Sequence, residues 1–386
     1  MKKLFAWITA AALMASCLTG CGSSAASGST AAGSEPASVE TAAATETAPQ
    51  EAPAASQPEQ SSETPEESSV PEEPSVQETE ESYEPVDISV GTIKGPTGIG
   101  MVKLMADSDA GLTDNNYTFT LAADASEIVS KVIAGEYDIA CVPTNSAAVL
   151  YQKTQGAVKL LALNTAGVLH ILQNTENSEP ITDWEQLKGK TIYTVGQGAN
   201  PEYVLDYVLS GHGIDPEQDV EIVFCAAADE VVAACATGEA DLCMLPEPAV
   251  SALQAKVTGF NEIFDMTDAW NEVATDGSIL TQGCVVVQTA FLEAHPDAVA
   301  HFLKEYEAAI DYVQANPDEA ASLMVQYEIV ASEAIAKSAL PGCHVMFAAG
   351  QEMKDSISGY YQVLFDADPT SVGGSLPDDA FYVINQ

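Results

Sequence analysis

The sequence of 386 residues predicts an α/β protein with two lobes, each a mainly parallel sheet flanked by helices. Beyond residue 86, short β-branched segments alternate with segments of helical period, the pattern of parallel strands joined by helices. The same pattern recurs 103 residues later without a gap. This period is too long for a solenoid repeat and favours two similar lobes, although generic strand–helix units also match by chance.

Composition restricts the partners before any element is placed. The chain carries 57 acidic and 13 basic residues, for a formal net charge of −44, and every basic residue is a lysine. Such a chain is repelled by nucleic acid, and it has no basic patch with which to bind anionic lipid. The missing arginines also remove the usual bidentate clamp for carboxylate, sulfonate or phosphate. We therefore expect no nucleic-acid partner.

The N-terminus has the features of an export signal. Two lysines precede a mostly apolar run over residues 4–18, which is too short to span a bilayer comfortably. Leu18-Thr19-Gly20 and Cys21 follow, and they resemble the lipobox of bacterial lipoproteins. The resemblance implies that residues 1–20 are a signal peptide and that Cys21 carries the lipid. An ordinary cleaved signal is the alternative, and Cys17 is a second candidate for acylation.

Residues 21–85 form a Ser/Ala/Pro/Glu-rich segment. Between residues 22 and 85 there are 14 Glu, eight Pro and no Lys. This composition cannot bury enough apolar surface to offset the entropy of ordering the chain. We expect a disordered tether with a reach of about 45 Å or more. A passive spacer between membrane and folded part is the main interpretation, and a specific binding role is the alternative.

The folded part begins near residue 86. Strands are predicted at 88–93, 117–121, 138–142 and 159–163, and helices at 98–106, 126–134 and 145–153. Shifted by 103 residues, the segment 127–143 lies over 230–246, with glycine, aspartate and proline matched. The chain is expected to cross between lobes at 167–173 and again at 279–288. The expected boundaries are 86–175 plus 279–386 for lobe 1 and 176–278 for lobe 2.

The repeat also nominates a ligand site. In open α/β sheets, ligands bind beyond the carboxyl ends of the strands, against helix N-termini. The corresponding loops are 94–98 and 143–146 in one lobe, and 196–200 and 246–248 in the other. The candidate ligand-binding residues in or beside these loops are Lys94, Pro96, Thr97, Gly98, Thr144, Asn145, Ser146, Gly196, Gln197, Gly198, Asn200, Tyr203, Glu247 and Trp270.

Individual candidates have specific roles and alternatives. Thr97 and Asn200 are expected to be helix N-caps. Tyr203 and Trp270 offer rings for stacking on a ligand ring or cation, with packing as the alternative for each. Lys94 is the only base in the four loops, and Glu247 is expected to face it. We expect a neutral, zwitterionic or cationic small molecule, while backbone amides leave an anion open.

Three segments resemble a known family: Gly238-Glu239-Ala240-Asp241-Leu242 continuing to Pro248, Leu187-Lys188-Gly189-Lys190-Thr191-Ile192, and Phe291-Leu292-Glu293-Ala294-His295-Pro296. They are similar to substrate-binding proteins of ABC importers, in the nitrate/taurine/aliphatic-sulfonate group that also includes binders of thiamine-pyrimidine precursors. The resemblance covers 86–386 and implies a type II periplasmic-binding-protein fold with a double-crossover hinge. It implies a monomeric receptor on the extracytoplasmic face, lipid-anchored, that delivers its ligand to a membrane permease and its ATPase.

Other classes of function stay open at this point. One is an enzyme on the same fold that acts on a pyrimidine or menaquinone precursor, and another is a surface protein without a solute. Relatives that make the thiamine pyrimidine carry a run of cysteines around a phenylalanine, which this chain lacks. No cysteines have C-x-x-C spacing and no histidines have i,i+4 spacing, so the sequence predicts no metal or cofactor. The cysteines in the folded part are expected to pack in the core, with one disulfide as the alternative, and His170 is expected to be structural.

Overall fold

The computed structural model describes residues 83–123, 125–176 and 178–385. The predicted signal peptide, Cys21 and nearly all of the predicted tether lie outside these residues. Within the described ranges, no helix is both long enough and apolar enough to cross a membrane.

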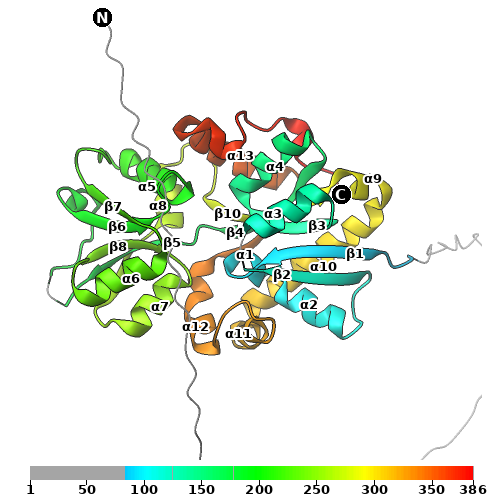
Figure 1. Cartoon of the computed structure of the whole chain (residues 1–386), viewed down its shortest axis with the longest axis horizontal. Coiled ribbons are helices and arrows are strands. Elements are labelled where there is room, and N and C mark those ends of the chain that lie inside the picture. The colour runs from blue at the N-terminus through cyan, green and yellow to red at the C-terminus, as the bar shows by residue number, and fades with distance from the viewer. Residues whose placement is uncertain (1–82, 124, 177, 386) are drawn as a thin grey trace, which may run out of the picture. The chain divides into compact units, whose positions relative to one another are not determined.

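Six strands form the first sheet, sheet A (Figure 1). They are β1 (Asp87–Ile93), β2 (Asn116–Ala122), β3 (Ile139–Pro143), β4 (Val158–Ala166), β10 (Thr281–Gln288) and β11 (Val345–Ala349), in the order β11-β4-β10-β3-β1-β2. β1 runs parallel to β2 and β3, whereas β10 lies antiparallel between β3 and β4. β10, the strand that returns from the second half of the chain, thus lies inside sheet A and pairs with a strand on each side.

Five strands form the second sheet, sheet B. They are β5 (Leu169–Asn174), β6 (Thr191–Val195), β7 (Glu221–Cys225), β8 (Leu242–Pro246) and β9 (Phe260–Asp265), in the order β7-β6-β8-β5-β9. β6 is parallel to β7 and β8, and β5 is antiparallel between β8 and β9. With β11 set aside, both sheets have the same order, and each receives its antiparallel strand from the chain that has just crossed over.

The repeat predicted from the sequence is therefore confirmed. Residues 139–143 of β3 and 242–246 of β8 differ by the predicted offset, as do α3 (Ala125–Ala134) and α6 (Ala228–Thr237). β5 was expected within lobe 1 but pairs in sheet B, because the crossing strand fills the place between β8 and β9. The remaining lobe boundaries stay a prediction.

Helices cover both faces of each sheet, which explains why β3 and β8 are nearly continuous apolar runs. In Figure 1, α5 and α8 lie on one side of sheet B, and α6 and α7 lie on the other. The helices of this half, besides α6, are η1 (Trp184–Leu187), α5 (Asn200–Gly211), α7 (Ala249–Lys256) and α8 (Met266–Val273). Those around sheet A, besides α3, are α1 (Pro96–Ile99), α2 (Val102–Asp109), α4 (Thr144–Thr154), α9 (Thr289–Ala294), α10 (Pro296–Ala315), α11 (Pro317–Gln326), α12 (Glu333–Ala339), η2 (Pro341–Cys343), α13 (Gly350–Ala367), η3 (Pro369–Val372) and η4 (Asp379–Phe381).

The two halves share a hydrophobic core beneath α13. Trp270 of α8 lies with its ring centroid 5.7 Å from that of Tyr360 on α13, and 4.4 Å from that of Tyr207 on α5. At a second place where the two halves meet, α12 packs against α7. The six cysteines in the described ranges are free thiols, and all but Cys225 are buried, as expected for small core residues.

Candidate functional site

A cavity of about 280 Å³ lies where strand-end loops of the two halves meet. We call it the α4–α5 cavity. Its lining comes from α4, from the start of α5, and from the end of α13 with η3: Asn145, Val149, Gly198, Ala199, Asn200, Tyr203, Leu364, Asp368, Thr370 and Ser371. The structure therefore brings four of the predicted site residues together, from loops about 50 residues apart in the sequence and from both halves of the repeat.

Asn200 is held in this cavity by α13. Its Oδ1 atom accepts a 2.6 Å hydrogen bond from the hydroxyl of Tyr360, so its NH₂ group is the part that remains to donate. The expected N-cap role of Asn200 is wrong, because Ala199 occupies the cap position and Asn200 is the first residue of α5. The side chain serves the contact with α13 instead.

Tyr203 and Asp368 meet on the other side of the cavity. The tyrosine hydroxyl donates to Asp368 Oδ2 at 3.3 Å. Partial burial, followed by the charge of Asp368, raises the pKa of Tyr203. Hydrogen bonds from the amide and hydroxyl of Thr370 lower the pKa of Asp368, which keeps it ionised. Asp368 is the one charged side chain among the residues that line the cavity.

The loop after β1 lies at a separate polar corner. Thr97 is buried inside α1, where its carbonyl accepts from Asn164 Nδ2 at 3.2 Å, and Gly95 takes the N-cap position that we expected for Thr97. A Cβ added at Gly283 would come within 2.6–2.8 Å of side-chain oxygens of Asn164, Thr165 and Thr97. Only glycine leaves room for these three polar groups to converge.

Lys94 and Glu247 do not face each other, and this expectation is wrong. Lys94 Nζ pairs with Glu328 Oε2 at 3.2 Å on the exposed surface. Glu247 is 6% exposed and accepts from the amide and hydroxyl of Ser251 at the start of α7, at 3.2 and 3.0 Å. Burial raises the pKa of Glu247, although the Ser251 bonds oppose that change. The carboxylate of Glu247 is thus held by hydrogen bonds at the start of α7.

The other loop candidates shape the backbone of their own loops. A Cβ at Gly98 would lie 2.2 Å from the carbonyl oxygen of Ile93, and Gly196 has a φ of 82°, which favours glycine. Thr144 is 1% exposed, its hydroxyl lies 3.2 Å from that of Thr281, and its carbonyl accepts from Tyr361. The remaining candidates lie outside the cavity lining: Pro96 opens α1, Ser146 is half-buried on α4, and Gln197 is exposed before α5.

Trp270 is a core residue in this structure. It is 0% exposed, and its indole N–H donates to the carbonyl of Ser278 at 3.2 Å. Its ring packs against Tyr207 of α5 and Tyr360 of α13, so it contacts helices of both halves of the fold. The packing alternative raised from the sequence therefore describes Trp270 better than a place in the cleft.

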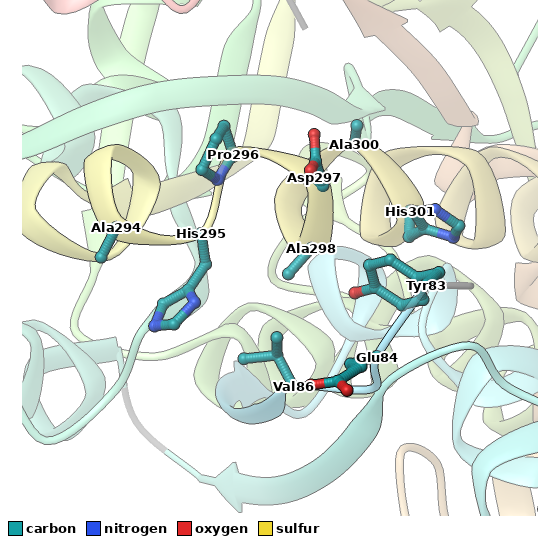
Figure 2. A pocket seen from close by; sticks show the side chains of 10 residues that line it. All are labelled: Tyr83, Glu84, Val86, Ala294, His295, Pro296, Asp297, Ala298, Ala300 and His301. Atoms are coloured by element: carbon teal, nitrogen blue, oxygen red, sulfur yellow. The ribbon is translucent and has the colours of Figure 1, made fainter. Parts of the chain in front are cut away.

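A larger cavity, about 510 Å³, lies away from the strand ends (Figure 2). It lies between the segment that enters β1 and the start of α10, beside the stacked rings of Tyr83 and His301, whose centroids are 3.9 Å apart. None of the predicted site residues is among the described residues that line it. Because ligands of open α/β sheets bind at the carboxyl ends of strands, the smaller α4–α5 cavity is the better candidate.

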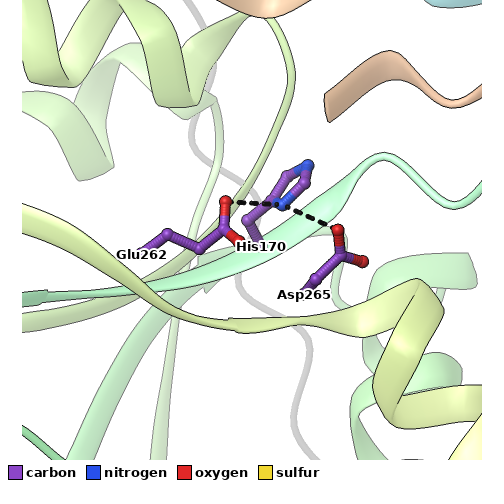
Figure 3. Close-up of side chains that lie close together, drawn as sticks. All are labelled: His170, Glu262 and Asp265. Carbon is purple, nitrogen blue, oxygen red and sulfur yellow. Dashed lines mark ion pairs between the residues drawn. The ribbon is translucent and has the colours of Figure 1, made fainter. Parts of the chain in front are cut away.

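A second polar cluster joins the halves at the crossing, and we call it the histidine junction: His170, Glu262, Asp265 and His344. His170 of β5 is 1% exposed, and its Nδ1 lies 3.1 Å from Glu262 Oε2 and 3.6 Å from Asp265 Oδ2 (Figure 3). His344, just before β11, places Nε2 3.2 Å from Asp265 Oδ2.

Electrostatics hold the junction together. Burial raises the pKa of Asp265, but the contacts with His344 and His170 outweigh it and lower that pKa to about 2. The hydrogen bond with Asp265 in turn raises the pKa of His344. Of these four residues, the sequence pattern singled out only His170, because nothing in a single sequence links positions 170, 262, 265 and 344.

The comparisons with known proteins agree with this architecture. A family model described as NMT1/THI5 like matches residues 109–320, more than half of the chain. The chain belongs to the NMT1/THI5-like family. The curated protein YtlA of Bacillus subtilis strain 168, named as a binding protein, is 31% identical over 135 residues. That match covers 34% of this chain and 39% of YtlA, well under two thirds of the relative.

Solved structures share the fold. An ABC transporter structure from Parabacteroides distasonis matches with a TM-score of 0.65 and 21% identity, over 78% of this chain and 99% of that chain. The periplasmic aliphatic sulphonate binding protein SsuA from Escherichia coli matches with a TM-score of 0.57 and 14% identity, over 75% and 94%. The NMT1/THI5-like chain described here thus has the two-lobed periplasmic-binding-protein fold predicted from its sequence.

Proposed function

We propose that this chain is a non-enzymatic solute-binding protein of an ABC importer, which takes a small organic solute at the α4–α5 cavity. The observation that carries the proposal is the meeting of Asn145 with Asn200 and Tyr203 in one cavity, since they come from opposite halves. A ligand that touches both halves favours the arrangement in which they are close. The binding-protein names of YtlA and SsuA support the same class of function.

The cavity favours a neutral, zwitterionic or cationic solute. Its lining offers two side-chain amides, three hydroxyls and one carboxylate, and no lining residue is cationic. A ligand amine would meet Asp368, whereas an anion would be repelled by it. SsuA is named for sulphonates, but this chain has no arginine to clamp such a group.

The proposed partners follow from the family and the N-terminal sequence. We propose a monomer, anchored by lipid on Cys21 to the extracytoplasmic face of the membrane, that presents its solute to a permease and its ATPase. The supporting observation is the Leu18-Thr19-Gly20-Cys21 motif. Cys21→Ser should move the protein from the membrane fraction to the soluble fraction, because one acylated residue provides the anchor. Equal membrane retention of this variant and the wild type would contradict the anchor.

Native mass spectrometry of protein purified from its own host tests the main proposal. A co-purifying small molecule supports the receptor, and its release permits calorimetric titration. Asn145→Ala and Asn200→Ala should each weaken binding of that molecule about 2- to 12-fold, the equivalent of one lost hydrogen bond. Asn116→Ala is the matched control, because this residue is at an exposed position of β2 and its side chain bonds Asp87 on the neighbouring strand. Turnover to a product would support the enzyme alternative instead, and binding that ignores both cavity variants would refute the site.

A further inference from the structure

The histidine junction contains three electron-pair donors that face one another. His170 Nε2 lies 3.0 Å from the carbonyl oxygen of Gly342, which can only accept a hydrogen bond. The ring proton therefore resides on Nε2, and in the neutral ring Nδ1 carries a lone pair. That lone pair faces the carboxylates of Glu262 and Asp265, which are also acceptors. Something positive is required between them.

A proton on Nδ1 fits this position poorly. The atom is fully buried and makes no aligned hydrogen bond with either carboxylate, despite the short distances. Figure 3 shows the two contacts leaving Nδ1 in different directions. An N–H bond lies in the ring plane and serves one acceptor well, whereas a metal ion accepts ligands from several directions.

The distances suit a metal ion of zinc size. Bonds of about 2.0–2.2 Å in a tetrahedral set place the ligand atoms about 3.3–3.6 Å apart. The Nδ1 atom lies 3.1 and 3.6 Å from the two carboxylate oxygens, and all three candidate ligand atoms lie within 4.8 Å of one another. Small movements of the half-exposed Glu262 side chain would complete the geometry.

The surrounding residues resemble the second shell of a metal site. Both histidines direct their other ring nitrogen at a backbone carbonyl: His170 at Gly342, and His344 Nδ1 at Gly167, 2.6 Å away. This contact fixes the orientation of an imidazole ligand and increases its basicity. A Cβ at Gly342 would lie 3.0 Å from His170 Nε2, so glycine allows the close approach.

The charge balance also favours a cation. His344 can contact both the Gly167 carbonyl and Asp265 as a donor only when its ring carries two protons, so it balances Asp265. The carboxylates of Glu262, of buried Glu247 and of Asp268 on α8 add further negative charge near the two histidines. The locus retains excess negative charge.

We propose that His170 Nδ1, Glu262 and Asp265 form a site for one divalent cation of the zinc class, with His344 as a positioning residue that holds Asp265. An imidazole ligand favours zinc and similar transition metals over calcium or magnesium, which prefer oxygen ligands alone. The three ligands come from β5 and β9, while Gly342 and His344 come from the segment before β11. The ion would therefore be bound by sheet B alone, and its ligands His170 and Asp265 would hold the contact with the segment before β11. This revises the sequence expectation of no metal.

Zinc titration of the purified full chain, first treated with EDTA, tests the site. We expect the wild type to bind one zinc ion more than Glu262→Gln, whose affinity for that ion falls at least tenfold. The melting temperature should rise by about 4 °C when free zinc is 100 times the dissociation constant. Calcium and magnesium should not reproduce the shift. The solute plays no part in this measurement, so the result is independent of the proposed receptor function.

His301→Gln is the matched control, because it removes a surface imidazole that faces Asp114 and should leave zinc binding unchanged. Cobalt substitution supplies a second readout: its visible absorption should be present in the wild type and lost in His170→Gln. Equal zinc uptake by the wild type and Glu262→Gln would overturn the proposal, since the zinc would then be on cysteines or surface acids. Absence of zinc uptake would also overturn it, and a proton on His170 Nδ1 would then balance the carboxylates.

Discussion

The α4–α5 cavity and the histidine junction are both places where the two halves meet, and they are built differently. The cavity uses amides and hydroxyls from α4, α5 and η3, with Asp368 as its one charged lining residue. The histidine junction uses the buried imidazole of His170 on the crossing strand β5, with partly exposed groups from β9 and from the segment before β11. Neutral hydrogen-bonding groups can bind and release a solute, whereas converging charges away from water need a bound counter-charge.

The comparison also shows how the halves are held. At the cavity, Tyr360 bonds Asn200, and its ring packs against Trp270 in the core that the two halves share. The cavity is therefore linked to this core through Tyr360.

The largest effect is expected from Trp270→Ala. Removal of a fully buried indole at the lobe junction should lower the free energy of unfolding by about 3–5 kcal/mol, because a large cavity is left in the core. Urea denaturation measures it. Trp184→Ala is the control, since this ring is only partly buried where it stacks on Phe264. If Trp270 instead faced a ligand, its variant would lose affinity with little loss of stability.

Two adjacent tyrosines on α13 give the next effect. Tyr361→Phe removes a buried hydrogen bond to the carbonyl of Thr144, which keeps its donor within α4, and should cost about 1–1.5 kcal/mol. Tyr360→Phe removes the donor to half-buried Asn200, which water can replace, and should cost about 1 kcal/mol or less. Only Tyr360→Phe should also change solute affinity. Thermal unfolding and calorimetry on both variants check the order, and a larger stability loss for Tyr360→Phe would contradict it.

The residues that the sequence could and could not predict follow the same division. The offset of 103 residues located Asn145, Asn200 and Tyr203 because α4 and α5, which carry them, follow strands of the repeat. In the histidine junction, His170 lies on the crossing strand and His344 on the segment before β11, outside the matched segments of the repeat, so spacing offered no signal for His344. The roles of side chains were harder to predict. Asn200 was expected to be an N-cap, because a local pattern does not show that the hydroxyl of Tyr360, 160 residues away, bonds its side chain.

A pH-dependent effect is expected on α5, the helix that carries Asn200 and Tyr203. Burial, with Glu202 and Glu217 nearby, raises the pKa of Asp206 to about 6. The folded state then holds the proton more tightly than the unfolded state, so this group contributes stability at low pH that is lost as pH rises from about 4 to 6.

Asp206→Asn should therefore increase the free energy of unfolding at pH 7 by on the order of 1 kcal/mol, a value discounted for partial exposure, and by nothing near pH 4. Urea unfolding at the two pH values measures this difference. Asp311→Asn, on an exposed position of α10, should show no such pH dependence. An equal gain at both pH values would rule out titration of Asp206 as the cause.

The smallest effect is expected from Lys94→Ala, and it sharpens the contrast between cavity and surface. Lys94 pairs with Glu328 in solvent, so its removal should change the free energy of unfolding by less than about 0.5 kcal/mol. The affinity for a neutral or cationic solute should stay the same, because Lys94 is not among the residues that line the α4–α5 cavity. Calorimetry with the co-purified solute measures this. Loss of binding on removal of this one lysine would instead mean an anionic solute held at the loop after β1, and the α4–α5 cavity would then be the wrong site.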